Sequence, residues 1–283
     1  MSVDLTGAID LHVHFGPDPH RQRSVTAQQA ASEAAAAGHA AIVLKSHDTP
    51  TANLAAALND VVGGIHIFGG ICCDHEVGGI NPAAVETALA LGARVVWLPT
   101  LSSRQDVDNG VAAQLGIPGP GLSILNDDGS LTDATHEVLR LTAEHSAVLA
   151  TGHISAAEHL AVVREQAPRG AVLVTHAMEE LAGPNLSIDQ CSELSHLGAT
   201  IELCAFTCRG HLATRAPAEL AACIRAVGAP HVTLGTDFGQ AFNEHPVPGL
   251  QTFADALWAE GIADDDLHTM TSTNPASLLQ LTI

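Results

Sequence analysis

The segment AIDLHVH, residues 8–14, is a short run of apolar and β-branched residues that ends in two histidines. Seven further runs of this kind follow it: AAIVLKSH (40–47), IHIFGGICC (65–73), ARVVWLPT (93–100), AVLATGH (147–153), AVLVTH (171–176), ATIELCAF (199–206) and HVTLGTD (231–237). Each is followed by a loop and then by an alanine-rich stretch. Strands that are apolar almost throughout are typical of a parallel sheet covered on both faces. The pattern therefore predicts eight buried parallel strands.

Helices are expected after each strand, at residues 25–38, 51–62, 82–92, 132–145, 155–167, 187–198, 216–228 and 249–260. Four residues stand where an N-cap is needed, namely Thr26, Thr51, Ser155 and Ser187. Two prolines suit a first helical turn, Pro82 and Pro217. Four glycines follow predicted helix ends, where a left-handed residue is favoured: Gly38, Gly92, Gly198 and Gly228.

Eight strand–helix units in 283 residues fit a closed (β/α)8 barrel, the TIM barrel, better than an open sheet. The rival architecture is a doubly wound sheet, which carries G-x-G-x-x-G between a strand and a helix. The chain has no such unit. Its glycine-rich stretch GIPGPG (116–121) contains prolines, which lack the N–H groups that a phosphate cradle needs. We therefore predict one barrel domain over residues 1–283.

One connection is unusually long. The fourth and fifth runs start at residues 93 and 147, 54 residues apart, which leaves a loop over about 101–131 that is rich in Gly, Pro, Asp and Asn. A loop that follows a barrel strand lies on the catalytic face. Two interpretations stay open for it: a lid over the site, or a decorated surface loop.

The charge balance excludes two classes of partner. The chain has 31 acidic against 11 basic side chains, a net charge of −20 at pH 7. Nucleic acids and anionic membranes attract clustered Lys and Arg, so neither is an expected partner. No apolar run approaches the ~20 residues that span a bilayer. The start, MSVDLTGAID, has no basic segment followed by an apolar one, so we expect no secretory signal and a cytoplasmic location.

Six cysteines show no C-x-x-C pair and are expected as reduced thiols: Cys72, Cys73, Cys191, Cys204, Cys208 and Cys223.

Histidines stand at the carboxyl ends of several predicted strands. His12 and His14 are two residues apart, so both point to the same face of the first strand. His153 and His176 end the fifth and sixth runs, and Asp237 ends the eighth. In a barrel these ends meet at one mouth. Imidazole and carboxylate groups that converge there suit Zn²⁺, Mn²⁺ or Fe²⁺. We predict one or two divalent ions per chain, with Zn²⁺ as the first choice.

At these positions the sequence resembles the amidohydrolase superfamily of metal-dependent barrel hydrolases. The stretches that carry the resemblance are DLHVHFGPD (10–18), TGH (151–153), THAM (175–178) and GTDFG (235–239). LHVHFGPD, AIVLKSHDTP and TDFGQ look closest to a branch without an assigned substrate. The resemblance covers essentially the whole chain. It implies four metal-ligating histidines, with Asp237 as a further ligand and as proton shuttle for the attacking water; the histidines are His12, His14, His153 and His176.

The fourth strand departs from the superfamily pattern. Binuclear members supply a bridging carboxylated lysine or a glutamate there, whereas this chain reads WLPT (97–100). The second strand instead offers Lys45, the only lysine of the chain. An amine can react with carbon dioxide or a carbonyl, and a guanidinium cannot. Four roles stay open for Lys45: a carboxylated bridge between two metals, a cation that binds a substrate carboxylate, a Schiff base, or an ion pair with a neighbour such as Asp48.

Residues near these ends are expected to contact substrate or to orient the ligands. His47, on the face of Lys45, is predicted to be a substrate contact or an extra metal ligand. Asp18 and Arg21 follow the first strand and are predicted substrate contacts, although Asp18 equally suits a cap for the turn after Pro17. Asp10 is expected to orient the ligating imidazoles.

Other polar residues near the mouth leave their roles open. Glu202 and Cys204 share one face of the seventh strand, whose direction the sequence leaves open. Asp74, His75 and Glu76 follow the third strand and suit turn geometry.

The sequence therefore predicts a metal-dependent hydrolase that cleaves an amide, cyclic amide, ester or lactone bond of a small molecule. Asp237 and Lys45 are its expected catalytic residues. Three alternatives remain: a metal-dependent decarboxylase, a Lys45-dependent lyase on the same barrel, and a binding barrel without catalysis. Because barrels often associate, a homo-oligomer is a further expectation.

Overall fold

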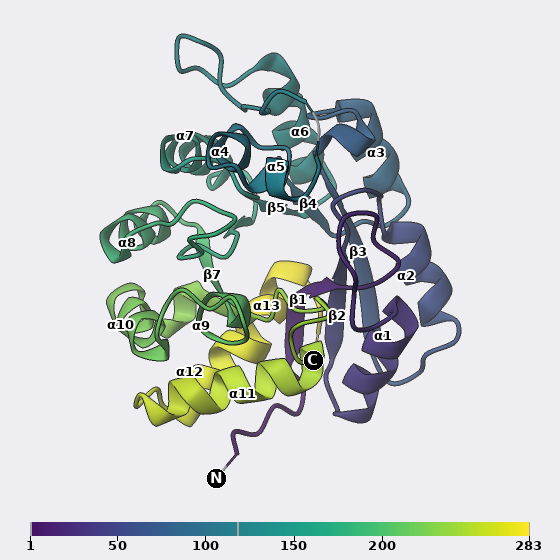
Figure 1. The fold of residues 1–283 in the computed structure, drawn as a ribbon, viewed down its shortest axis with the longest axis vertical. Helices are drawn as coiled ribbons and strands as arrows, with labels where there is room; N and C mark the ends of the chain where they lie inside the picture. The colour runs from purple at the N-terminus through teal and green to yellow at the C-terminus, as the bar shows by residue number, and fades with distance from the viewer. Residues whose placement is uncertain (1, 118, 283) are drawn as a thin grey trace.

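A sheet of eight parallel strands forms the centre of the molecule (Figure 1). The computed structural model describes residues 2–117 and 119–282. The strands are β1 (Ile9–His14), β2 (Ala41–Lys45), β3 (His66–Cys72), β4 (Val95–Trp97), β5 (Val148–Ala150), β6 (Val172–Val174), β7 (Thr200–Cys204) and β8 (Val232–Gly235). They are hydrogen-bonded in chain order, and each neighbouring pair is parallel. All eight predicted strands are confirmed.

The last strand returns to the first and closes the barrel. The backbone N–H of His14 donates to the carbonyl of Phe238 at 2.9 Å, and the N–H of Asp237 donates to the carbonyl of His12 at 3.0 Å. A β-bridge joins Val13 to Phe238 beside them. The predicted (β/α)8 barrel is therefore confirmed. Its closure also brings the first and last predicted ligand positions together, although they are more than 220 residues apart in the chain.

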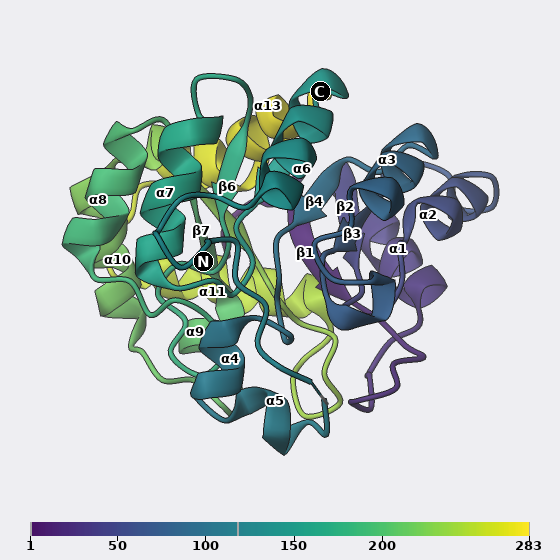
Figure 2. The same cartoon turned by 90° about the horizontal axis from the view of Figure 1, so that it is seen from above.

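Helices surround the sheet, as the two perpendicular views show (Figures 1 and 2). The predicted helices form as α1 (Ala27–Ala36), α2 (Ala52–Asn59), α3 (Pro82–Ala90), α6 (Asp133–Glu144), α7 (Ala156–Gln166), α8 (Ile188–His196), α10 (Pro217–Val227) and α11 (Pro246–Ala259). Short helices that the sequence pattern did not predict are α4 (Arg104–Asp108), α5 (Val111–Gln114), α9 (Ala205–Cys208), α12 (Asp264–His268) and α13 (Asn274–Leu279). The part of the chain that the structure describes contains no helix long and apolar enough to cross a membrane.

Three of the four predicted N-caps are confirmed. Thr26, Ser155 and Ser187 each accept the third backbone N–H of their helix and complete a capping box. Thr51 stands at the N-cap position of α2 as predicted, but its side chain forms no cap. Its hydroxyl donates to the Leu44 carbonyl at 2.7 Å and accepts the N–H of Gly70 at 2.8 Å, so it joins β2 to β3 instead. The four glycines predicted after helix ends all have positive φ.

Apolar side chains from strands around the barrel fill its interior. One buried cluster joins Leu11 of β1, Val43 of β2, Trp97 of β4, Val148 of β5 and Leu173 of β6. Burial of such side chains is the main stabilising contribution to the fold, about 1.5–3 kcal/mol for each large one. This packed layer is the floor on which the polar residues at the strand ends rest.

Candidate active site

The predicted site residues gather at the carboxyl ends of the strands. A cavity of about 60 Å³ is lined there by eight of them: His14, Asp18, Arg21, Lys45, His47, His153, His176 and Asp237. His12 does not line the cavity because its side chain is fully buried at the cavity floor. The loop over 101–131 contributes Leu101, Val111 and Leu115 to the wall. This loop therefore packs over the mouth.

Five imidazole rings form a closed circle in this mouth. Neighbouring ring centroids are 5.4 Å apart for His12–His14, 5.0 Å for His14–His47, 5.9 Å for His47–His153, 4.7 Å for His153–His176 and 5.6 Å for His176–His12. The rings come from four different strand ends, so only the closed barrel brings them together.

His12, His14 and Asp237 form the tightest group. Oδ1 of Asp237 lies 3.2 Å from Nε2 of His12 and 3.0 Å from Nε2 of His14. Each residue has a ligand atom within 4.8 Å of those of the other two. Asp237 has a φ of 54°, a left-handed conformation that is uncommon for a residue with a side chain. Such strain is concentrated at functional sites.

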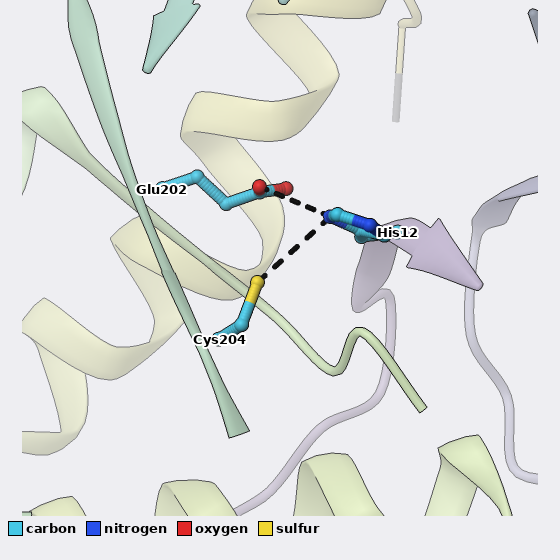
Figure 3. Close-up of side chains that lie close together, drawn as sticks. All are labelled: His12, Glu202 and Cys204. Atoms are coloured by element: carbon cyan, nitrogen blue, oxygen red, sulfur yellow. Dashed lines mark hydrogen bonds and ion pairs between the residues drawn. The ribbon is translucent and has the colours of Figure 1, made fainter. Parts of the chain in front are cut away.

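Glu202 is hydrogen-bonded to His12 (Figure 3). Its Oε2 lies 3.1 Å from Nδ1 of His12 and also accepts the backbone N–H of His176 at 3.0 Å. With the carboxylate as acceptor, Nδ1 of His12 carries the proton and Nε2 turns its lone pair to the mouth. Cys204 lies on the same side, with Sγ 3.9 Å from Nδ1. The face of β7 that the sequence left undecided therefore points into the barrel.

The prediction that Asp10 orients an imidazole was wrong. Its Oδ1 accepts the backbone N–H groups of His12 at 3.0 Å and of Thr236 at 3.1 Å, and its Oδ2 accepts the Thr236 hydroxyl at 2.6 Å. Asp10 therefore joins the backbone of β1 to the end of β8. Among the described residues its carboxylate has no hydrogen bond to an imidazole ring, and Glu202 takes the orienting role.

Asp106 holds His153. Its Oδ2 lies 2.6 Å from Nδ1 of His153, and both side chains are buried. Ser103 caps α4 and accepts the backbone N–H of Asp106 at 3.0 Å, which fixes the carboxylate in place. Nε2 of His153 is buried without a hydrogen-bond partner among residues 2–117 and 119–282. Sequence reasoning missed Asp106, because nothing local distinguishes it from the other acidic residues of the 101–131 loop.

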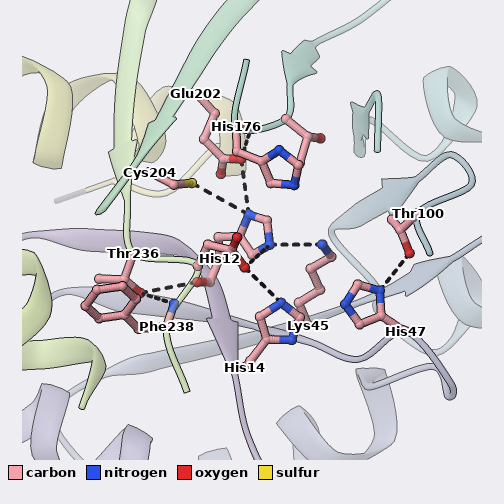
Figure 4. A network of polar contacts seen from close by, with 12 residues as sticks. His12, His14, Lys45, His47, Thr100, His176, Glu202, Cys204, Thr236 and Phe238 are labelled. Atoms are coloured by element: carbon pink, nitrogen blue, oxygen red, sulfur yellow. Dashed lines mark hydrogen bonds and ion pairs between the residues drawn. The ribbon is translucent and has the colours of Figure 1, made fainter. Parts of the chain in front are cut away.

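His47 is hydrogen-bonded to Thr100 (Figure 4), and through it to a third buried carboxylate, Asp74. Nδ1 of His47 lies 2.7 Å from the Thr100 hydroxyl, which itself donates to Asp74. Because that single hydroxyl proton points to Asp74, Nδ1 of His47 is the donor in its own bond. Asp74 also accepts the backbone N–H groups of Thr100 and Ser102 at 2.8 and 3.0 Å. The WLPT stretch at the end of β4 thus supplies the partner of a histidine.

Lys45 is fully buried beside His12. Its Nζ lies 2.9 Å from Nε2 of His12 and 5.7 Å from the centre of the Trp97 ring. The alternative that paired Lys45 with Asp48 was wrong, because Asp48 instead pairs with His20 at 2.9 Å. Within the described ranges, Lys45 has no carboxylate at ion-pair distance.

Asp18 organises the turn after β1. Its Oδ1 accepts the backbone N–H groups of His20 and Arg21, both at 2.8 Å. Its Oδ2 accepts from the Arg23 guanidinium at 2.9 and 2.5 Å. Burial raises the pKa of Asp18, but Arg23 and the hydrogen bonds outweigh it and the pKa is lowered overall. The turn-capping interpretation of Asp18 is confirmed, and Arg21 extends into the cavity wall.

Burial keeps four of these imidazoles neutral. Burial and, next, the charge of Lys45 lower the pKa of His12 to about 3. Burial likewise holds the pKa of His14, His47 and His176 well below the ordinary value. Neutral imidazole is the form that binds metals.

Two buried carboxyls behave in the opposite way. Burial raises the pKa of Glu202 and of Glu179, a further cavity residue, each to about 7. Sequence reasoning did not single out Glu179.

The donor set fits a divalent cation. Imidazole nitrogens and a carboxylate are the ligands that Zn²⁺ and related ions prefer. Nε2 of His153 and Nδ1 of His176 are buried without a partner among the described residues, which is costly unless something binds them. Carboxylates or a hydroxyl hold the opposite nitrogen of His12, His47 and His153, as is usual for metal-ligating histidines. These residues could therefore hold a metal.

Solved structures of similar fold are amidohydrolase-family proteins. An amidohydrolase from Pseudomonas aeruginosa is similar with a TM-score of 0.62 at 12% identity, covering 99% of this chain and 96% of the other. A probable dipeptidase from the same organism has a TM-score of 0.63 at 11% identity, with 96% and 94% covered. A 2,6-dihydroxybenzoate decarboxylase from Rhizobium has a TM-score of 0.52 at 13% identity, with 97% and 99% covered.

These likenesses concern the fold, which agrees with the superfamily resemblance of the strand-end motifs. No curated protein matches the sequence. A model described as a family of unknown function, DUF6282, matches residues 7–202, which is more than half of the chain. The chain belongs to the DUF6282 family.

Proposed function

We propose that this protein is a metal-dependent hydrolase that activates water to cleave an amide, cyclic amide, ester or lactone bond of a small molecule. The observation that carries the proposal is the convergence of His12, His14 and Asp237, with ligand atoms mutually within 4.8 Å. Neutral imidazoles, locked by buried partners, support it. The fold shared with an amidohydrolase and a probable dipeptidase is consistent with this reaction class.

The proposed ligands divide into two groups. His12, His14 and Asp237 would hold one ion, and His153 and His176 would hold a second. Lys45, in carboxylated form, would be a further ligand. Zn²⁺ is the first choice, with Mn²⁺ and Fe²⁺ as alternatives that the same donors accept. When bound, such an ion would polarise the substrate carbonyl and lower the pKa of water to about 7.

Asp237 is the proposed proton carrier. It ends β8 and lines the cavity, so its carboxylate can reach both a water molecule and the leaving group. As the water oxygen attacks the carbonyl carbon, Asp237 takes the proton; as the carbon–nitrogen or carbon–oxygen bond breaks, Asp237 gives that proton to the leaving atom. Leu101 and Val111 in the cavity wall limit the access of bulk water.

The first test is metal content per chain, measured by mass spectrometry on untagged protein purified without chelator. Two equivalents support the binuclear site, and one supports a mononuclear site with Lys45 as substrate anchor. If none binds after reconstitution with zinc and bicarbonate, the hydrolase proposal fails.

The second test is hydrolysis of a panel of small lactones, esters and cyclic amides. We expect Asp237→Asn to lower the rate by about 10²–10⁴-fold, the usual contribution of a general base. Asp189→Asn, at an exposed position of α8, is the matched control and should keep the rate.

A lyase or decarboxylase is the second candidate function. Lys45 is buried beside His12 and has no carboxylate partner in the described ranges, as a reactive or substrate-binding amine requires. The fold is also shared with a decarboxylase. Release of carbon dioxide from a substrate, or trapping of Lys45 by borohydride, would favour this function over hydrolysis.

A further inference from the structure

Arg21 presents a cation to the cavity without an internal partner. It lies between β1 and α1, is half-buried, and lines the cavity wall. Its backbone N–H is bonded to Asp18, but its guanidinium forms no hydrogen bond or ion pair with the residues that the structure describes. A half-buried guanidinium that is left unpaired loses part of its hydration without compensation. An anion bound in the cavity would supply that compensation.

The nearby carboxylates are already engaged. Asp18 is bound by Arg23 and by two backbone N–H groups. Asp48 pairs with His20. Asp237 lies against His12 and His14. Burial and the neighbouring Arg23 lower the pKa of Arg21, and they outweigh Asp18 and Asp237, which raise it.

The loop that carries Arg21 is fixed to the barrel. The N–H of Ala241 donates to the carbonyl of Gln22 at 3.0 Å, and the N–H of Ser24 donates to the carbonyl of Gly239 at 2.7 Å. These bonds join the loop to the segment that follows Asp237. Arg21 is therefore held in position before a ligand arrives, which reduces the entropic cost of binding.

Part of the cavity wall is apolar, while Arg23, Glu179 and Gln240 add polar groups to it. Leu101, Val111 and Leu115 come from the 101–131 loop, and Phe206 comes from α9. A volume of about 60 Å³ equals the liquid volume of about two water molecules, so the ligand must be small. The cavity therefore suits a small molecule with a short apolar body and one anionic end.

We propose that the substrate carries a carboxylate that Arg21 binds, with its apolar body against Leu101, Val111 and Leu115. This inference rests on the proposed function, since it places the bond to be cleaved at His12, His14 and Asp237. A guanidinium pairs with a carboxylate through two parallel hydrogen bonds. Arg21 thus selects small carboxylic acid derivatives and orients them towards the strand ends.

The test compares butyrate with its uncharged amide, butyramide, by ligand-observed NMR titration of the zinc-loaded full-length protein. We expect wild type to bind butyrate at least about tenfold more tightly, since hydrogen bonds to charged groups contribute about 1.5–3 kcal/mol. Arg21→Gln should lower the affinity for butyrate by about 10- to 100-fold and leave the affinity for butyramide unchanged. Arg21→Lys should give an intermediate butyrate affinity, because lysine keeps the positive charge but cannot form the two parallel hydrogen bonds. Arg140→Gln, an exposed arginine of α6, is the matched control.

Equal butyrate affinity in wild type and Arg21→Gln would overturn the proposal. Stronger displacement of butyrate by inorganic phosphate than by acetate would also overturn it, in favour of a phosphate substrate. Zinc content is measured on the same samples. A lack of zinc would contradict the proposed hydrolase. If butyrate binding in those zinc-free samples still depends on Arg21, the proposed carboxylate site at Arg21 is supported independently of the hydrolase.

Discussion

Nζ of Lys45 lies 2.9 Å from Nε2 of His12, and both residues are buried at the floor of the mouth. Since Nδ1 of His12 faces Glu202 at 3.1 Å, Nε2 holds the lone pair towards which Lys45 points. We propose the same lone pair as a metal ligand. It cannot accept a hydrogen bond from the lysine and bind a metal at the same time. Metal binding must therefore move Lys45 or modify it.

Bicarbonate should strengthen zinc binding. After the Lys45 ammonium loses a proton, the amine adds carbon dioxide and releases a second proton. The competing cation thus becomes an anionic carbamate. We expect zinc affinity, measured by competition with a chromophoric chelator, to rise about tenfold or more with bicarbonate, as for the gain of a charged partner. Lys45→Arg should remove the effect because a guanidinium does not form a carbamate. An equal bicarbonate response in Lys45→Arg would contradict the carboxylated bridge.

Asp106 should control the affinity of the site through His153. Asp106→Asn removes the negative charge that holds Nδ1 of His153 and should lower zinc affinity by about 10- to 100-fold, as is usual for such outer partners. Asp108→Asn changes an exposed carboxylate on the same helix and should have no effect. Circular dichroism melting of both variants separates lost affinity from lost folding. Equal affinity in the two variants would exclude an orienting role for Asp106.

Gly152 should be irreplaceable directly before His153. Its φ is +67°, and a Cβ there would overlap the carbonyl oxygens of Leu98 and Pro99. Gly110 has a φ of +77° with open space around it. Gly110→Ala therefore measures the cost of placing a side chain at positive φ without any steric overlap. We expect Gly110→Ala to lower the free energy of unfolding by about 1–2 kcal/mol. Gly152→Ala should cost a further ~1–3 kcal/mol from overlap, and it should also lower the zinc content. Urea unfolding measures the free energy of unfolding of both variants. An equal decrease in Gly110→Ala and Gly152→Ala would refute the steric argument.

His159 should make the protein sensitive to acid. Burial lowers its pKa from 6.5 to about 4. Between these values the unfolded chain binds more protons than the folded protein, so stability falls as the pH falls from 6.5 to about 4. The predicted contribution is about 3 kcal/mol. In chelator-treated protein, the free energy of unfolding of His159→Gln should fall less than that of wild type between pH 6.5 and about 4. His136→Gln, at an exposed site, is the control; identical pH profiles for wild type and His159→Gln would disprove the assignment.

Local patterns predicted the elements well because each depends on residues close in the chain. The apolar runs became the eight strands, and capping residues such as Ser155 and Ser187 marked helix starts through bonds to their own first turn. The side-chain cap predicted at Thr51 did not form, for the opposite reason. The Thr51 hydroxyl bonds to Leu44 and Gly70, on two neighbouring strands, and no local rule anticipates such partners.

The sequence by itself determined the barrel and the strand ends that meet at its mouth, because period, composition and chain order suffice for both. The tertiary structure alone decided how each histidine is held. Glu202 lies 190 residues from His12, Asp106 lies 47 from His153, and Thr100 lies 53 from His47. These pairs form only when the sheet closes and the long loop packs over it. The candidate ligand residues can be identified in the sequence, but their hydrogen-bond partners are brought into place only when the barrel closes. These partners determine which ring nitrogen carries the proton.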